Sequence, residues 1–299
     1  MTPSAPPRPR RHVLSFDVEE YFHVEAAASC VRRAEWEGFD ARVVPAVRQV
    51  LGLLADHDAT ATFFVLGWVA RRQPDLVREI ARAGHEIASH GMSHQMIHRL
   101  SPAAFGRELA DSKKLLEDLA GAPVTGFRAP TFSVTHGTAW AIDELAGAGY
   151  EYDSSVFPVR HDRYGVPGAP RWAHWAVGPG GGRVLEIPPL TVRVGGANLP
   201  IGGGGYLRLL PVRVLAWGLR AAWRARHAGV IYIHPWEFDP SQPHLPMGRV
   251  TKWRHRVNLH RTASKVRWLL EHHRFCDFRR GMPAFRTSAT EQFAYGAAG

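Results

Sequence analysis

The chain has 299 residues, 45% of them hydrophobic and 21% charged, which is ample for one large globular domain with a substantial core or for two smaller domains. No apolar run reaches the roughly 18 to 20 residues needed to span a bilayer, and the basic, Pro-rich N-terminus lacks the apolar segment of a signal peptide. The formal net charge of +10 suits polyanions or anionic lipid headgroups as partners, without deciding between them.

Short apolar segments alternate with amphipathic segments from residue 12 to about residue 155. Strands are expected at 12–18, 59–67, 85–90, 124–130 and 150–155, and helices at 43–57, 74–84, 101–121 and 135–149. Ser101 and Gly121 carry the N-cap and C-cap signals of the third of these helices. This alternation predicts parallel βα units.

Residues 157–206 interrupt the alternation with a stretch rich in Gly and Pro, although VLEIPPLTVRV within it has strand character. Its glycine runs lack a following GK[ST] and do not form GxGxxG after a strand, so they do not predict a phosphate loop. They are interpreted as loops that approach a ligand closely, or as plain linkers. The alternation then resumes with helices at 210–229 and 261–273 and strands at 230–236 and 274–278.

About seven strand–helix units predict an α/β fold, a distorted (β/α) barrel of the TIM type with about seven strands. A doubly wound open sheet is the alternative. The expected organisation is a basic, disordered tail at 1–11, a single catalytic domain at 12–285 with an insertion at about 157–206, and a C-terminal tail at 286–299. Cys30 and Cys276 lie far apart and outside any CxxC, so neither a disulfide scaffold nor a thiolate zinc site is expected.

Polar residues recur at the carboxyl ends of the predicted strands. In a barrel these ends converge on one face, where catalytic groups gather, so residues from five strands would meet in one cleft. They are Asp17 and Glu19 after VLSF, His90 after EIAS, Arg128 after VTGF, Asp153 after YEY and His234 after VIYI.

His90 and His94 in SHGMSH are either metal ligands or one polar face at the start of a helix. Two imidazoles and one carboxylate, with positions left for water, make up a hydrolytic zinc centre. Glu19 and Glu20 compete for the carboxylate role; if the backbone stays extended, Asp17 shares a face with Glu19, while Glu20 points away. His98, four residues after His94, is expected at the surface.

Arg128 in an apolar strand requires a carboxylate partner, which Asp17 or Asp153 could supply. His234 in IYIHPW is either a functional imidazole or a core histidine bonded to the backbone. Trp236, two residues further on, suits either a sugar-stacking platform or the core.

Together these motifs resemble the polysaccharide deacetylases with a NodB homology domain, carbohydrate esterase family 4. The resemblance covers roughly residues 12 to 280 and rests on five ordered motifs: FDVEE (16–20), HGMSH (90–94), RAP (128–130), Asp153 in YDSS, and IYIH (231–234). DVEEYFHVEA, RAPTFS, YDSSVFP, GGGGYLRLLP and HPWEFDP resemble, more narrowly, the deacetylases of exopolysaccharide loci associated with exosortase systems. The chain departs from the family in having Asp-x-Glu in place of adjacent aspartates, and Thr131 where an aromatic residue usually follows RxP.

The resemblance implies a metal-dependent hydrolase that removes N-acetyl groups from an amino-sugar polysaccharide or its lipid-linked precursor, with Zn²⁺ as the expected metal. The roles that it implies are a base (Asp17), an acid (His234), an arginine that orients the base (Arg128) with its tether (Asp153), metal ligands (Glu19, His90 and His94) and substrate or oxyanion contacts (Pro130, Thr131 and Trp236).

An N-acetylated glycan is the expected partner, and the basic stretch at 249–261 suits an anionic membrane surface. Nucleic acid is not expected, because no recognised nucleic-acid module accompanies that stretch. The expected location is the cytoplasm, at or near the inner face of the membrane. The alternatives are a related metal amidohydrolase acting on a cyclic ureide or a formylated amino sugar, and a non-catalytic carbohydrate-binding protein.

Overall fold

The computed structural model describes residues 11–161 and 164–296. Seven of its strands are parallel and adjacent, in the order β7-β5-β4-β3-β2-β1-β10. They are β1 (His12–Val18), β2 (Thr62–Val65), β3 (Glu86–Ser89), β4 (Gly126–Phe127), β5 (Tyr152–Asp153), β7 (Arg183–Glu186) and β10 (Val230–Ile233).

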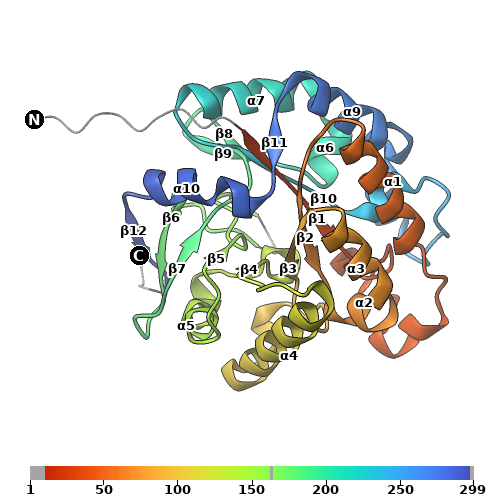
Figure 1. Ribbon diagram of the computed structural model, residues 1–299, viewed down its shortest axis with the longest axis horizontal. Helices are drawn as coiled ribbons and strands as arrows, with labels where there is room; N and C mark the ends of the chain where they lie inside the picture. The colour runs from red at the N-terminus through yellow and green to blue at the C-terminus, as the bar shows by residue number, and fades with distance from the viewer. Residues whose placement is uncertain (1–10, 162–163, 297–299) are drawn as a thin grey trace, which may run out of the picture.

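Most of the helices lie on the outside of this curved sheet (Figure 1). They are α1 (Val43–Ala55), α2 (Gly67–Arg72), α3 (Pro74–Arg82), α4 (Pro102–Ala120), α5 (Trp140–Gly147), α6 (Gly205–Leu209), α7 (Val212–Arg224), α8 (Arg249–Arg256), α9 (Thr262–His272) and α10 (Phe278–Ser288). As predicted, Ser101 accepts a hydrogen bond from the Ala104 amide at the start of α4, and Gly121 ends that helix with a left-handed φ of 66°. None of the described helices has the length and apolarity needed to cross a membrane.

The predicted α/β fold is confirmed, although among the described residues β7 and β10 do not pair with each other. Residues that follow β7 bond to β10 instead: Leu190 N–H donates to the Val230 carbonyl (2.9 Å), Tyr232 N–H donates to the Gly202 carbonyl (2.8 Å), and Gly204 N–H donates to the Tyr232 carbonyl (3.1 Å). At Gly203 (φ 146°) a Cβ atom would lie 1.7 Å from the Tyr232 carbonyl oxygen, so only glycine fits here. At Gly203 the glycine run therefore approaches a strand closely.

The stretch predicted as an insertion contributes to the barrel itself. It contains β7 and the antiparallel β6 (His174–Val177), together with a separate hairpin of β8 (Thr191–Val194) and β9 (Ala197–Pro200). The predicted C-terminal tail also takes part, because α10 extends into it and β12 (Gln292–Ala294) pairs with β6. The predicted N-terminal tail lies outside the described residues except for Arg11.

The interior of the barrel is apolar at one end and polar at the other. Val13 belongs to the apolar cluster that fills the interior with Phe278 and Phe285 of α10, whereas Leu14 and Phe16 belong to the cluster under the outer helices. Because side chains alternate along a strand, Ser15 and Asp17 share the face of Val13. The strand β11 (Phe275–Cys276) pairs with the start of β1 at the apolar end, so β1 carries Asp17 to the opposite, carboxyl end.

Candidate metal centre and active site

Glu19, His90 and His94 form the group of potential metal ligands that stands out among the described residues. One ligand atom from each lies within 4.8 Å of the others, and all three residues are buried. The distance between His94 Nε2 and Glu19 Oε2 is 2.5 Å. Glu19 Oε2 is buried without a hydrogen bond of acceptable geometry from the described residues. A lone-pair-bearing oxygen left in this way, facing two imidazoles, fits a divalent cation.

The HxxxH segment is a loop held in place from both sides, not a helix. Gly91 (φ 75°) and His94 (φ 55°) adopt left-handed backbone conformations, which turn the chain after β3. Glu108 of α4 accepts hydrogen bonds from the backbone amides of Met92 (3.1 Å) and Ser93 (3.2 Å). The two imidazoles therefore converge through loop geometry. His98, expected at the surface, is exposed.

Two of the three potential ligands, His90 and Glu19, are oriented by a neighbour. His90 Nδ1 lies 2.8 Å from the Arg128 carbonyl, which can only accept, so Nδ1 carries the proton and Nε2 keeps its lone pair. Trp236 Nε1 donates to Glu19 Oε1 (3.1 Å). Burial lowers the pKa of His90 to about 4. Burial opposes ionisation of Glu19, but the imidazoles of His94, His234 and His90 together outweigh it and hold the pKa of Glu19 below its usual range. Neutral imidazoles and an ionised carboxylate are the forms that bind metal.

Glu20, the alternative to Glu19 as carboxylate ligand, bonds to the start of α1 instead. Its oxygens accept hydrogen bonds from the backbone amides of Arg42 (3.0 Å) and Val43 (3.1 Å) at the start of α1. Burial raises the pKa of Glu20 to about 7. Its carboxylate satisfies the first amides of that helix and does not belong to the ligand group.

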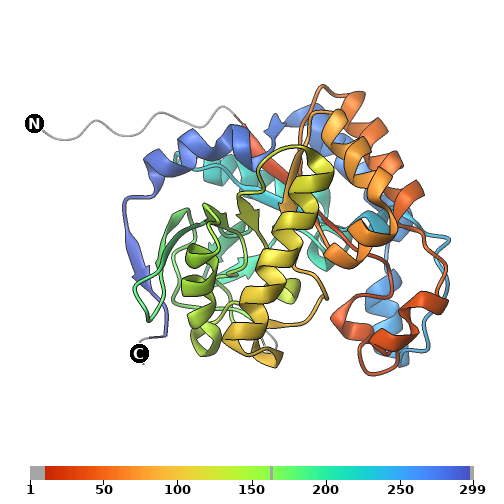
Figure 2. The ribbon, with the colours of Figure 1, turned by 60° about the horizontal axis from the view of Figure 1, so that its bottom comes forward.

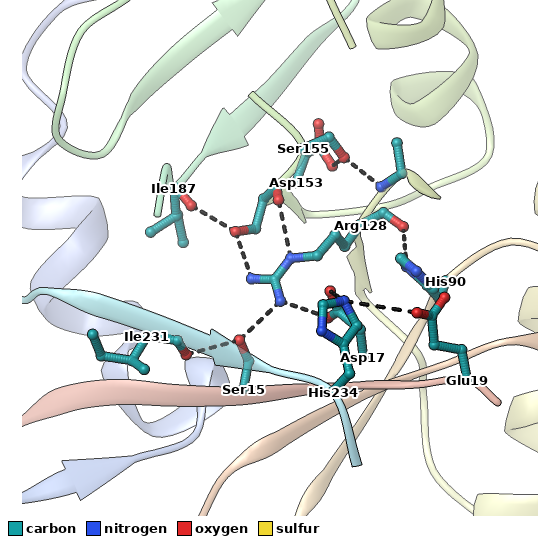
Figure 3. Close-up of polar contacts among 12 residues, drawn as sticks. Ser15, Asp17, Glu19, His90, Arg128, Asp153, Ser155, Ile187, Ile231 and His234 are labelled. Carbon is teal, nitrogen blue, oxygen red and sulfur yellow. Dashed lines mark hydrogen bonds and ion pairs between the residues drawn. The ribbon is translucent and has the colours of Figure 1, made fainter. Parts of the chain in front are cut away.

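Asp17 and Arg128 form a buried ion pair beside the ligands. Arg128 Nη1 donates to Asp17 Oδ1 (2.7 Å) and to Ser15 Oγ (2.9 Å), and the arginine side chain is completely buried. Figure 3 shows Asp17 between this guanidinium and the imidazole of His234, whose Nε2 lies 3.9 Å from Asp17 Oδ2. The carboxylate thus faces the cavity on one side and is charge-paired on the other.

Asp153 is predicted to tether Arg128, but the hydrogen bonds of Arg128 on this side go to Ser154 instead. Arg128 donates from Nε to the Ser154 carbonyl (3.1 Å) and from Nη2 to Ser154 Oγ (2.9 Å). Asp153 instead accepts from Ser155 and lies beside Glu186 in the paired strand. Burial raises the pKa of Asp153 to about 6, and burial together with Asp153 raises that of Glu186 well above its usual value. Two adjacent buried carboxyls are most stable when they share a proton.

His234 is held by a chain of contacts that the sequence reasoning missed. Its Nδ1 lies 2.8 Å from Glu237 Oε1, and Arg208 Nε donates to Glu237 Oε2 (2.6 Å). Burial opposes protonation of His234, but Glu237 and the nearby carboxylates of Glu19 and Asp17 outweigh it and raise its pKa to about 9. His234 is the N-cap of a short helix that starts with a proline, and Glu237 follows it by three residues, which is the spacing of a capping box. This spacing is a sequence signal that could have identified Glu237.

The remaining predicted contacts divide into one at the cavity and two in the interior. Thr131 has a left-handed backbone (φ 58°) and lines a cavity of about 210 Å³ together with Asp17, Glu19 and His234. Pro130 is buried behind it. Trp236 is only 5% exposed and its ring stacks with His234 and His255, so it orients Glu19 and leaves little face for a sugar.

Comparison with known proteins divides the chain in two. Residues 36–152 match the family described as polysaccharide deacetylase, and residues 154–282 match a domain of unknown function, DUF3473. A peptidoglycan-N-acetylglucosamine deacetylase from Bacillus cereus is 38% identical over 82 residues, 27% of this chain and 38% of the relative. A chitooligosaccharide deacetylase from Rhizobium leguminosarum bv. trifolii is 40% identical over 68 residues, 23% of this chain and 32% of the relative. These matches span about a third of each relative.

Solved structures share the fold at low sequence identity. A Mycobacterium smegmatis protein assigned as a polysaccharide deacetylase has a TM-score of 0.61 at 20% identity, covering 97% of each chain. PuuE allantoinase has a TM-score of 0.57 at 16% identity, covering 95% of this chain and 93% of its own. The sequence matches thus show a polysaccharide deacetylase region at residues 36–152, followed by a DUF3473 region at residues 154–282, and the solved structures show the shared fold.

Proposed function

We propose that this chain is a metal-dependent hydrolase that removes N-acetyl groups from an amino-sugar-containing polysaccharide or its lipid-linked precursor, in exopolysaccharide biosynthesis. The observation that carries the proposal is the convergence of a ligand group, a charge-paired carboxylate and an oriented imidazole on one cavity, from segments more than 200 residues apart. Each group corresponds to one requirement of amide hydrolysis.

Glu19, His90 and His94 would hold the metal, for which two imidazoles and a carboxylate favour Zn²⁺. When bound, such an ion acts as a Lewis acid on the amide carbonyl and increases the acidity of water. The Thr131 amide, at the edge of the same cavity, would donate to the oxygen that develops negative charge.

The proton transfers would be made by the chain's own residues. Asp17, kept ionised by Arg128, would take the proton of the attacking water. His234 would give its Nε2 proton to the departing amine, with Glu237 accepting from Nδ1 so that Nε2 faces the cavity. Arg128, Glu237 and Arg208 would act as positioning residues, because none of them lines the cavity.

The proposal is tested by metal analysis together with an assay of acetate release from N-acetylglucosamine oligomers, with and without a chelator. We expect the purified protein to contain zinc, the chelator to abolish turnover and added Zn²⁺ to restore it. His94→Ala should lose the metal and the activity together, because it removes one of three ligands. His98→Ala is the matched control and should retain both. A fully active, chelator-resistant enzyme would rule out the metal-dependent mechanism.

PuuE allantoinase shares this fold, which favours a second candidate, a metal amidohydrolase acting on a cyclic ureide. The polysaccharide deacetylase match over residues 36–152 favours the glycan. Assaying allantoin beside the oligomers separates the two. A metal-loaded protein that binds oligomers without releasing acetate would instead be a non-catalytic carbohydrate-binding protein.

His234→Gln is expected to lower kcat by about 100-fold or more, the scale of general acid catalysis, without unfolding the protein. Glu237→Gln should lower kcat by about tenfold, because a neutral side chain orients the imidazole less firmly. Since neither residue is a proposed ligand, the zinc content should stay unchanged in both variants. Steady-state kinetics would check the two kcat values, and metal analysis would check the zinc content. A rise in KM at constant kcat in His234→Gln would assign His234 to binding alone.

A further inference from the structure

The positive charge of the chain is concentrated in one segment. Residues 187–270 hold 13 of the 37 Lys and Arg residues but only 2 of the 27 Asp and Glu residues, so the rest of the chain has 24 basic against 25 acidic side chains. The two acidic residues are Glu237, which pairs with Arg208, and Asp239, which pairs with Arg42. The basic surface of this segment is therefore barely offset by its own acids.

The same segment carries all the large hydrophobic side chains that the described residues expose. They are Val194, Leu199, Leu209, Trp217, Trp223, Val250 and Trp253. Exposed apolar side chains among basic residues are the composition of surfaces that lie in the interface of an anionic bilayer, where Trp rings favour the headgroup level.

The two most exposed of these side chains lie on one short helix beside the cavity. In α8, Val250 is 65% and Trp253 58% exposed, next to Arg249, Lys252 and Arg254. These three cations make no ion pair with any described residue. Figure 2 shows α8, in blue at the lower right, beside the red-orange segment that contains residues 25–38, and Ala26 of that segment lines the same cavity as Thr251 of α8.

The inner side of α8 faces the candidate active site. Thr251, Arg254 and His255 line a second cavity, of about 310 Å³, which His234 also lines. Val24, Ala26, His161 and Tyr232 also line both this cavity and the one at the ligand group, so the two spaces adjoin.

The position of α8 is fixed relative to the reaction centre. Arg208 Nη1 donates to the carbonyls of Arg254 (3.1 Å), His255 (2.9 Å) and Val257 (3.1 Å) at the end of α8, while its Nε holds Glu237. His255 stacks on Trp236 with ring centres 4.6 Å apart. A surface that holds α8 would therefore also orient the cavity.

We infer that the outer face of α8, formed by Arg249, Val250, Lys252 and Trp253, docks on an anionic lipid surface and presents the adjoining cavities to a glycan carried by a lipid. The lipid-borne substrate rests on the proposed deacetylase function. The docking itself does not, because it follows from the charge and exposure of α8. Trp253 and Val250 would enter the headgroup region, and Arg249 and Lys252 would contact lipid phosphates.

The test is co-sedimentation of the full chain with vesicles of phosphatidylcholine, alone or mixed with phosphatidylglycerol. We expect binding to the mixed vesicles that weakens as salt is raised, and little binding to phosphatidylcholine alone. The Val250→Ser/Trp253→Ser variant should lose about tenfold or more in affinity, given the apolar area withdrawn from the lipid. Trp217→Ser is the matched control, because Trp217 is 45% exposed but lies on α7 and not on α8. This variant should bind like the wild type.

Several results would overturn the inference. They are an absence of binding to mixed vesicles, a loss caused by Trp217→Ser in place of the α8 variant, or equally tight binding to single-stranded DNA that the α8 variant retains. The last result would indicate a general polyanion site. Acetate release from water-soluble oligomers should be the same in the α8 variant and the wild type, so failure of the docking and failure of the proposed function give different results.

Discussion

Replacing Asp17 with Asn is expected to lower kcat for acetate release by about 10²- to 10⁴-fold while the zinc content stays at the wild-type level. The amide can still accept the hydrogen bond from Arg128, but it cannot take a proton from water. Asp17 Oδ1 already receives that bond at 2.7 Å, so the geometry should change little. Zinc analysis and steady-state kinetics on the same preparation would check both parts.

The control for this prediction is Glu19→Gln, which should lose zinc because the carboxylate of Glu19 belongs to the ligand group. If Asp17→Asn came out metal-free while Glu19→Gln stayed loaded, the roles of the two carboxylates would be reversed. A fully active Asp17→Asn variant would exclude Asp17 as the base.

Replacing Arg128 with Met is expected to lower the free energy of unfolding by about 3–5 kcal/mol, the cost of breaking a buried ion pair from one side. Arg128 is completely buried, and the change leaves the carboxylate of Asp17 without its counter-charge and Ser15 and Ser154 without their donor. Urea denaturation followed by circular dichroism measures the loss.

Arg48→Met is the matched control, because Arg48 pairs with Glu79 at the surface, where both side chains are more than a third exposed. Its cost should stay below about 1 kcal/mol. The double change Asp17→Leu/Arg128→Met should recover part of the stability, because no unpaired charge then remains buried. A loss as small as the control's for Arg128→Met would contradict a charged pair in the interior.

The fold could be predicted from the sequence wherever apolar runs are long and bounded by clear signals. The strand predicted at 12–18 coincides with β1, and the helix predicted between Ser101 and Gly121 coincides with α4. The sequence places β7 in an insertion because this strand is only four residues long and lies between stretches rich in Gly and Pro. Its place in the sheet depends on pairing with β5, a tertiary contact that local periodicity does not record.

The candidate site was predictable in its residue types but not in its finer contacts. Strand ends brought Asp17, Glu19, His90 and His234 together, because parallel strands point their carboxyl ends the same way. The partner of Arg128 depended on which side chain of YDSS turned inward, and Ser154 took that place. Contacts of this kind depend on the rotamers of packed side chains, so spacing alone could not choose among them.

The border between the two matched regions falls inside one sheet. The first match ends at residue 152 and the second begins at residue 154, so the border falls at Asp153, the last residue of β5. The next neighbour of β5 in the sheet is β7, which belongs to the DUF3473 region. Asp17 and Glu19 precede the first match, while His234 and Glu237 lie in the second. DUF3473 therefore completes the barrel and supplies the proposed acid and its partner.

The position of β1 between β2 and β10 has a consequence for how this protein is made. Among the strands of this sheet β1 is made first, yet one of its edges stays open until residues 230–233 arrive to form β10. An apolar strand with an open edge pairs readily with other chains, and closing so long a loop is slow. During synthesis this edge of β1 therefore needs shielding from other chains until the segment that forms β10 has been made.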